Sequence, residues 1–506
     1  WTFRNQEEED LRESVVSTFQ WQPNDDWDIN LDVEYSDNHY SEDRHDLLLT
    51  TARDGLHSHV IDDNMNLLYR EGIAKFETQG YYRTEDESYN GFGLEVKHYI
   101  TDDLVITGDL SYSKSHRDRT SFKSRINSGV YGNYSLDTRE HRLAELKFLD
   151  ADFNAVGDAG YDATTAFDPT NPESWVGGEG KYEREVEERI NRVNAAKVDI
   201  EYAVDGDFFT QLKAGIRYSE AELWSDLDDD VGIDPATGEE LPEYKTKDAT
   251  EVGLLIENCF VDWNNDEWLT SESGAGLQGG QFAQFDGRCG YGSLSQGNED
   301  RSFVDLGPRK DRRSTGDVNV QEDTLAIYGM ANFESELFGL PVSGNFGVRV
   351  IRTDVESLGY LNEYQINSTV DPTDSDLITY ELDIVQDADG NNVLTTNIQK
   401  HDVTSVLPSA NITFHYSEEF LIRTAAYRSM SRPQLLDMSA GRVIKQSDTS
   451  EEITDPNELI SEVSGGNPYL EPLMSNNLDL SFEWYPSLDT AISFALYGKQ
   501  FEANFR

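Results

Sequence analysis

Long hydrophobic runs and cysteine are both scarce in this sequence. No stretch of the 506 residues approaches the roughly 20 consecutive apolar residues of a membrane-spanning helix, which excludes a helical membrane protein. The strands of a membrane barrel alternate apolar and polar residues, so the same lack does not exclude a barrel. The two cysteines, Cys259 and Cys289, suit an exported bacterial protein with one disulfide. Two unpaired buried thiols are the alternative.

Basic residues are also scarce. The chain has 41 Lys and Arg against 97 Asp and Glu, a formal net charge of −56. This charge excludes a nucleic-acid partner, which requires a basic face, and it disfavours adhesion to an anionic lipid surface. We attribute the acidity to a salty habitat or a solvated surface. Negative external loops would repel anionic ligands, which favours a neutral or cationic cargo.

No enzyme signature is present. The sequence lacks a Walker loop, a nucleophile elbow and a dinucleotide fingerprint. Its nine histidines are scattered, and His57 and His59 have no third ligand at zinc spacing. We therefore expect neither an enzyme nor a resident cofactor. Residue 1 is Trp and no signal peptide is present, so we expect a truncated or processed start.

The strongest pattern in the sequence is a repeated unit of strand, tight polar turn and strand. In one copy Trp27, Ile29 and Leu31 share one face, while Asp28 and Asn30 lie on the other. A period of two predicts β-strands with one apolar face. Six copies occur, at residues 17–36, 93–113, 197–219, 328–354, 409–429 and 478–498.

The connections at the two ends of these hairpins differ in length. Turns within hairpins are a few residues, such as Thr101-Asp102-Asp103, whereas the links between hairpins are long. This asymmetry predicts an all-β fold, an antiparallel transmembrane β-barrel with short periplasmic turns and long extracellular loops. The links are residues 37–92, 114–196, 220–327, 355–408 and 430–477.

Aromatic residues recur at two levels of the hairpins. From Leu104 to Tyr112 a tilted strand rises about 19 Å, which suits two aromatic girdles bounding a lipid-thick apolar band. The residues before the turns are Trp21, Tyr99, Tyr202, Phe338, Tyr416 and Tyr485. Those on the outgoing strands are Tyr35, Tyr112, Tyr218, Tyr427 and Tyr497.

Several segments carry a family resemblance. They include FDPTNPESW, VDIEYAVDGDFFTQLKAGIRYSEAE, LPSANITFHYSEEFLIRTAAYRSMSRPQLLDMSAG and GNPYLEPLMSNNLDLSFEWYPSLDTAISFALYGKQ. These segments resemble the barrel of TonB-dependent receptors, in particular a large subfamily of marine and plant-associated proteobacteria that is often linked to carbohydrate uptake. The resemblance covers most of the chain, but residues 40–80 and 230–320 carry none.

The resemblance implies an energy-coupling box, a plug domain and a barrel of roughly twenty-two strands in the outer membrane of a Gram-negative bacterium. We expect about twelve strands and no plug, so residues 1–506 would be a partial barrel that lacks the plug, the first strands and the last strands. An open half barrel would leave two edges in lipid. The implied partners are outer-membrane lipid and TonB, the latter through the missing N-terminal region. A surface lipoprotein is a further partner that the sequence leaves open.

Two motifs of the resemblance have structural interpretations. Ser431-Arg432-Pro433 closes an outgoing strand, because proline cannot donate to a ladder. Gly466-Asn467-Pro468 is interpreted as the turn into the next strand. We expect neither motif to act in chemistry.

The 220–327 link, interpreted as the longest extracellular loop insertion, provides the candidate ligand contacts. Trp263 and Trp268 could stack on sugar faces and Asp266 could accept hydroxyl protons, although a mini-core within the loop is the favoured alternative. Tyr360 and Arg442 are weaker candidates from neighbouring loops. A disulfide between Cys259 and Cys289 is expected to staple the 220–327 loop, because no other cysteine competes.

No metal site is expected, and calcium is the weak alternative. Calcium prefers clustered oxygen ligands, which two acidic segments offer. A full twelve-residue calcium loop does not fit the second segment, and its Asp-Gly-Asn is equally a plain hairpin turn. The candidate ligands are Asp226, Asp228 and Asp230 in the first segment, and Asp387 and Asp389 in the second.

The sequence therefore favours a receptor that imports a scarce solute, with a carbohydrate as the expected cargo. A siderophore or iron receptor, a passive porin and a soluble secreted glycan-binding β-protein are the alternatives.

Overall fold

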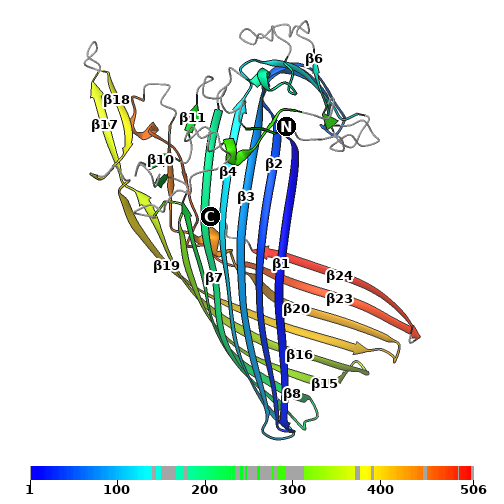
Figure 1. The fold of residues 1–506 in the computed structure, drawn as a ribbon. Coiled ribbons are helices and arrows are strands. Elements are labelled where there is room, and N and C mark those ends of the chain that lie inside the picture. Colours follow the sequence, from blue (N-terminus) through cyan, green and yellow to red (C-terminus); the bar gives the residue numbers. More distant parts are fainter. Residues whose placement is uncertain are drawn as a thin grey trace.

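Twelve long antiparallel strands form one curved meander (Figure 1). The computed structural model describes residues 2–139, 144–149, 167–175, 180–228, 231–233, 240–242, 245–247, 259–261, 276–277, 282–290, 313–370, 377–388, 392–447, 453–487 and 489–502. The long strands are β1 (Thr2–Asn24), β2 (Trp27–Ile61), β3 (Leu67–Tyr99), β4 (Leu104–Asn127), β7 (Gly180–Ala203), β8 (Phe209–Asp228), β15 (Val318–Leu337), β16 (Leu340–Asn362), β19 (Leu394–His415), β20 (Phe420–Ser431), β23 (Leu473–Ser487) and β24 (Thr490–Glu502).

Shorter elements lie at the end of the sheet opposite the tight turns (Figure 1). They are β5 (Gly132–Asp137), β6 (Glu145–Leu149), β9 (Val231–Ile233), β10 (Glu240–Pro242), β11 (Lys245–Lys247), β12 (Phe260–Val261), β13 (Gly276–Leu277), β14 (Gln284–Phe285), β17 (Tyr364–Val370), β18 (Ile378–Ile384), β21 (Val443–Gln446), β22 (Ile460–Ser464) and the 3-10 turns η1 (Pro172–Trp175), η3 (Leu435–Met438) and η4 (Pro456–Glu458). In the described part of the chain, no helix has both the length and the apolar character needed to cross a membrane.

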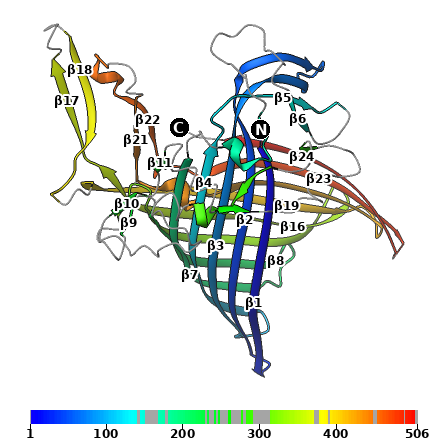
Figure 2. The same ribbon diagram turned by 45° about the horizontal axis from the view of Figure 1, so that its top comes forward.

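The six hairpins expected from the sequence are present, and each is closed by a short turn. Every neighbouring pair of long strands is antiparallel, which confirms the predicted fold class. Figure 2 shows the curvature of the sheet. Within the described residues, β1 pairs only with β2 and β24 only with β23, so the ladder has two ends.

The strands run farther than the sequence pattern predicted. Residues 37–92, expected to be a loop, are mostly the upper parts of β2 and β3, which turn at residues 62–66. The link expected at 220–327 shortens to 229–317, because β8 and β15 extend into it. Above the apolar band the outer face becomes polar, as in the row of His39, Asp86 and Asp118. The apolar alternation therefore ends there, although the ladder continues.

The ladder register sorts residues onto two faces. One row of direct cross-strand partners over eight strands consists of Ile29, Val96, Gly108, Val198, Ile216, Ile327, Val350 and Val406. The adjacent row consists of Asp28, Lys97, Thr107, Asp199, Gly215, Tyr328, Arg349 and Leu407. The first row is apolar, and the second is mostly polar. We call these the outer and inner faces.

Only some of the tyrosines assigned to an aromatic girdle on the outgoing strands lie on the outer face. Tyr35, Tyr112 and Tyr218 alternate in step with the apolar row and lie on the outer face. Tyr427 and Tyr497 have the opposite parity and line an inner cavity of about 1180 Å³ together with Asp479. Aromatic residues are ordinary strand residues on either face, so spacing from the turn did not fix their side.

A hydrophobic core caps the upper ends of β2, β3 and β4. It combines Phe76 and Ile126 with rings from two distant links, including Trp175 and Phe285, all less than 2% exposed. Phe260, Phe282 and Phe285 of the longest link thus pack in a core shared with the sheet, and not in a core of the loop alone.

The predicted disulfide between Cys259 and Cys289 is confirmed and lies inside this core, with Cα atoms 5.5 Å apart. The chain next to it presses against β3. Thr78 Oγ1 donates to Ala283 O at 2.9 Å, and a Cβ on Gly80 would lie 2.0 Å from Phe285 O. Only glycine at position 80 allows this approach.

The two faces predict unequal responses to a new charge. Val198→Arg places a cation on the outer face near the middle of the apolar band, where it should cost about 2–4 kcal/mol in a bilayer. Thr107→Arg places the same cation at nearly the same depth on the inner face, beside Asp199. In the complete protein refolded into lipid, the heat-modifiable folded band should be lost for Val198→Arg and kept for Thr107→Arg. Equal yields would contradict the assignment of the faces.

The disulfide predicts a local effect. It closes a segment with a sequence separation of 30, which in the loop-entropy model stabilises by about 3–4 kcal/mol. Cys259→Ser combined with Cys289→Ser should therefore speed proteolysis and amide exchange at residues 282–290, while the heat-modifiable barrel band is unchanged. Chemical reduction of the native protein is the matched control and should give the same pattern. Unchanged exchange at residues 282–290 would contradict a stabilising role.

Candidate functional site

Above the apolar band, the inner faces of β2, β3, β4 and β7 carry a wall of charged side chains. The ladder places them in consecutive rows that read across the four strands. These rows are Tyr40, Glu85, Arg119 and Glu187; Glu42, Arg83, Ser121 and Glu185; and Arg44, Tyr81, Lys123 and Glu183. We call this surface the charged inner wall.

Glu187 is the central carboxylate of the charged inner wall. Its side chain is 3% exposed. Oε2 accepts from Arg117 Nη2 at 2.7 Å and lies 3.2 Å from Arg119 Nη2, while Oε1 accepts from Ser225 Oγ at 3.1 Å. Arg189 pairs with Oε1 as well. Burial by itself raises the pKa of Glu187, but the three guanidinium groups outweigh it and hold that pKa below its usual value.

Two further carboxylates are buried in the same wall. Glu42 lies 3.3 Å from Arg44 Nη1 and 3.2 Å from Arg83 Nε, and Asp46 accepts from Arg4 Nε at 2.8 Å. The same guanidinium groups also make cation–π contacts with aromatic rings. The Arg44 guanidinium lies 4.1 Å from the Tyr81 ring centre, and that of Arg83 lies 4.9 Å from the Tyr40 ring centre. The wall is therefore a set of paired charges with its guanidinium groups still partly exposed.

Sequence reasoning missed this wall. Its sequence signal is charge at every second residue, as at Arg117 and Arg119 on β4 and at Glu183, Glu185 and Glu187 on β7. These positions fall within the 114–196 link, which was interpreted as a loop, so their period of two was not read as a strand face.

A second feature is an inserted loop, which we define as residues 432–447 and 453–472. It leaves the end of β20 and packs on the inner face of β8, β15 and β16. Arg432 pairs with Glu322 of β15 and donates to Thr324 Oγ1 at 3.2 Å. Met438 of η3 is 2% exposed and packs in a core with Leu223, Val318, Val320 and Val355.

The inserted loop also contacts β16 and β19 closely. A Cβ on Gly359 would lie 2.1 Å from Gly441 N, and Asn397 Nδ2 donates to Ala440 O at 2.8 Å. Asn467 of the Gly466-Asn467-Pro468 motif donates its backbone N–H to Asp437 O at 2.7 Å, and Asp437 follows the Ser431-Arg432-Pro433 motif in the same loop. β20 ends at Ser431, as the Ser431-Arg432-Pro433 motif predicted.

The structure brings together two of the five proposed ligand residues. Arg442 N donates to Tyr360 O at 3.3 Å. The Arg442 guanidinium donates from Nη1 to Ser439 O at 3.2 Å and Gly441 O at 2.8 Å, so it braces the inserted loop. The Tyr360 ring lies 5.8 Å from the Arg313 guanidinium. The other three, Trp263, Asp266 and Trp268, lie outside the described residues, so ligand binding at these positions stays a prediction.

Of the five calcium candidates, the structure describes the side chains of Asp226 and Asp387. Asp226 is buried near Asp317, and Asp387 is exposed. Burial raises the pKa of Asp317 to about 6, and the negative charge of Asp226 adds to the rise. Asp230 and Asp389 lie outside the described residues, as does the side chain of Asp228. Calcium binding stays a prediction.

Comparison with known proteins gives a family and a fold likeness. Residues 137–503 match the family described as TonB dependent receptor-like, beta-barrel. No curated protein matches the chain.

Among solved structures, the chain is similar to the ferric-catecholate import receptor Fiu from K12 E. coli, at 10% identity and a TM-score of 0.40, over 97% of this chain and 58% of that one. It is also similar to the siderophore receptor PiuA from Acinetobacter baumannii, at 11% identity and a TM-score of 0.39, over 96% of this chain and 56% of that one. A third similar structure is a double mutant of the Serratia marcescens hemophore receptor HasR in complex with its hemophore HasA and heme, at 8% identity and a TM-score of 0.29, over 93% of this chain and 50% of that one. The chain therefore spans between half and three fifths of the length of these receptors.

The buried carboxylate of the charged inner wall predicts a measurable loss of stability. Glu187→Gln leaves Arg117, Arg119 and Arg189 without their common counter-ion, which should cost about 3 kcal/mol. Glu356→Gln is the matched control, because its pair with Lys400 is exposed and should be worth less than about 1 kcal/mol. Thermal unfolding of the complete protein in detergent measures both.

The pH dependence of stability, compared between the native protein and Glu187→Gln, is a second measurement. The folded pKa of Glu187 lies below the unfolded one, so its stabilisation is present above the unfolded value of about 4.5 and is lost as pH falls through the folded value. The native protein should lose stability below pH 4.5 more steeply than Glu187→Gln. Parallel curves would contradict the role of this carboxylate.

Proposed function

Because the chain belongs to the TonB-dependent receptor-like β-barrel family, we propose that it forms part of the wall of an importer that takes up a scarce solute with energy delivered through TonB. The family places the protein in the outer membrane of a Gram-negative bacterium, and its members are transporters, not enzymes. In this proposal TonB and any surface lipoprotein act on the complete receptor. The outer face meets lipid and the inner face meets the solute.

The charged inner wall is the observation that supports solute contact. Guanidinium groups donate in a planar fork to carboxylate, catecholate or sugar oxygens. The wall lies on strands above the apolar band, where an entering solute would pass before it reaches the level of the membrane. The oxygen atoms of a solute could replace the carboxylates that pair with Arg83, Arg117 and Arg119 as hydrogen-bond acceptors.

The class of cargo follows from the local charge and not from the total charge. The net charge of −56 favoured a neutral or cationic cargo, and the family resemblance favoured a carbohydrate. On the inner wall, however, cations and carboxylates are paired, so the total charge does not act there as an unbalanced negative field. This favours the siderophore alternative, a ferric chelate that carries negative charge, as the second candidate cargo beside a neutral oligosaccharide.

Binding to the complete purified receptor should separate the two cargos. Arg117→Ala combined with Arg119→Ala should weaken binding of a ferric-siderophore anion at least tenfold, because each charge-assisted hydrogen bond is worth about 1.5–3 kcal/mol. Binding of a neutral oligosaccharide should change much less. Arg352→Ala is the control, since Arg352 pairs with Asp354 on the outer face.

Calorimetry against a panel of both ligand classes gives the answer. Oligosaccharide binding alone would identify a carbohydrate importer. Siderophore binding that is unaffected by the double variant would place the solute away from this wall. The absence of binding by either class would contradict both cargos.

A further inference from the structure

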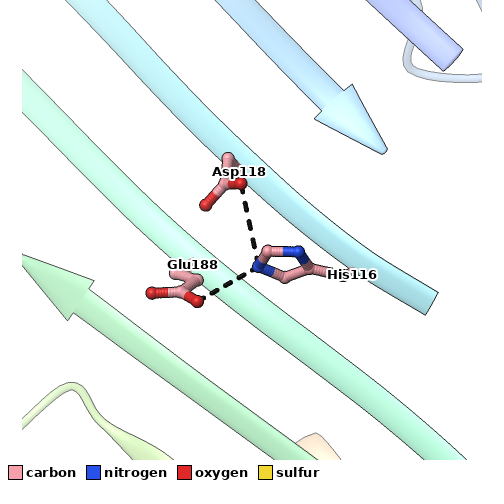
Figure 3. Close-up of side chains that lie close together, drawn as sticks. All are labelled: His116, Asp118 and Glu188. Carbon is pink, nitrogen blue, oxygen red and sulfur yellow. Dashed lines mark hydrogen bonds and ion pairs between the residues drawn. The ribbon is translucent and has the colours of Figure 1, made fainter. Parts of the chain in front are cut away.

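Three ligand-bearing side chains converge on the outer face just above the apolar band (Figure 3). His116 and Asp118 come from β4, and Glu188 comes from β7. His116 Nε2 lies 3.1 Å from Glu188 Oε1 and 3.7 Å from Asp118 Oδ2. The three ligand atoms all lie within 4.8 Å of one another.

The ladder fixes these side chains on one face. Asp118 and Glu188 are direct cross-strand partners, and His116 is two residues from Asp118 along β4. Leu110 and Tyr112 have the same parity on β4, so the cluster lies outside the barrel wall, beyond the end of the apolar band. This position is separate from the charged inner wall and from the path of a solute.

The two arginines that alternate with the cluster residues on β4 are directed to the opposite face. Arg117 and Arg119 alternate with the cluster residues on β4 and pair with Glu187 on the inner face. Lys114 and Arg192 are cross-strand partners in an adjacent outer row, on the side of the apolar band. The imidazole of His116 therefore faces two carboxylates on a rigid pair of strands.

The spacing fits a small divalent ion. Zinc binds imidazole nitrogen and carboxylate oxygen at about 2.0–2.2 Å, so neighbouring ligand atoms in a tetrahedral site are about 3.4 Å apart. The two distances from His116 Nε2 bracket that value. A small rotation of the Asp118 side chain, which is 60% exposed, would bring its oxygen into place. One imidazole and two carboxylates are ligands that zinc and similar transition ions accept.

We propose that His116, Asp118 and Glu188 form a site for a divalent transition-metal ion of the zinc class on the outer wall of the barrel. The ion lies between the imidazole of His116 and the two carboxylates and ties β4 to β7. Three protein ligands leave one position open toward the outside, where a water molecule completes the shell. Among the calcium candidates, Asp226 is the direct cross-strand partner of Glu188, but the grouped ligand atoms come from His116, Asp118 and Glu188 alone.

The test uses the complete receptor, purified without a histidine tag and stripped with a chelator. Zn²⁺ is titrated by calorimetry, and Co²⁺ is added to record the visible absorption of a four-coordinate ion. One equivalent should bind to the native protein. His116→Ala and Glu188→Gln should each weaken Zn²⁺ binding at least tenfold and abolish the cobalt spectrum.

The matched control is His39→Ala. His39 lies on the same face in the row of Asp118 and pairs with the single carboxylate Asp86, at 2.6 Å. This variant should bind Zn²⁺ as the native protein does, and all variants should keep the heat-modifiable folded band. The proposal is overturned if the native protein does not bind Zn²⁺, if His116→Ala binds it unchanged, or if binding is lost only in His39→Ala or His59→Ala.

Discussion

The register of one antiparallel ladder determines the rest of the structure. Because side chains alternate strictly, a direct pairing such as Val198 with Ile216 fixes the face of every other residue on both strands until a bulge intervenes. The ladder between β4 and β7 continues without a bulge from Leu104 to Ile126. The same register therefore places apolar side chains against lipid at one level, and places Glu187 inward and Glu188 outward at a higher one.

The charged inner wall shows how an acidic chain holds many charges in a confined space. Each buried carboxylate, at Glu42, Asp46 and Glu187, has guanidinium groups within hydrogen-bonding or ion-pairing distance. Burying such groups unpaired would cost several kcal/mol, so pairing is a condition for building the wall. The inserted loop follows the same rule, since Arg432 reaches across two intervening strands, β16 and β19, to the buried Glu322.

Much of the fold could be predicted from the sequence, because lipid imposes a pattern on it. The hairpins, the tight turns and the disulfide were all predicted from the amino-acid sequence. Above the lipid that pattern ends. Residues 37–92 were therefore interpreted as a loop, although they continue β2 and β3. The sites were harder to predict, because pairs such as His116 with Glu188 are set by a register between strands that are 72 residues apart in sequence. No local spacing signals such a contact.

The approach of the longest link to Gly80 also bears on the order in which the molecule assembles. Thr78 and Ala283 are 205 residues apart in sequence, so their contact can form only after β8 and most of the following link have left the ribosome and crossed the inner membrane. Until then the core holds only its nearer rings, such as Tyr134 and Phe167 against Phe76, and lacks Phe282 and Phe285. The hydrophobic core over the upper ends of the first strands is therefore completed by a segment that follows β8 in the chain.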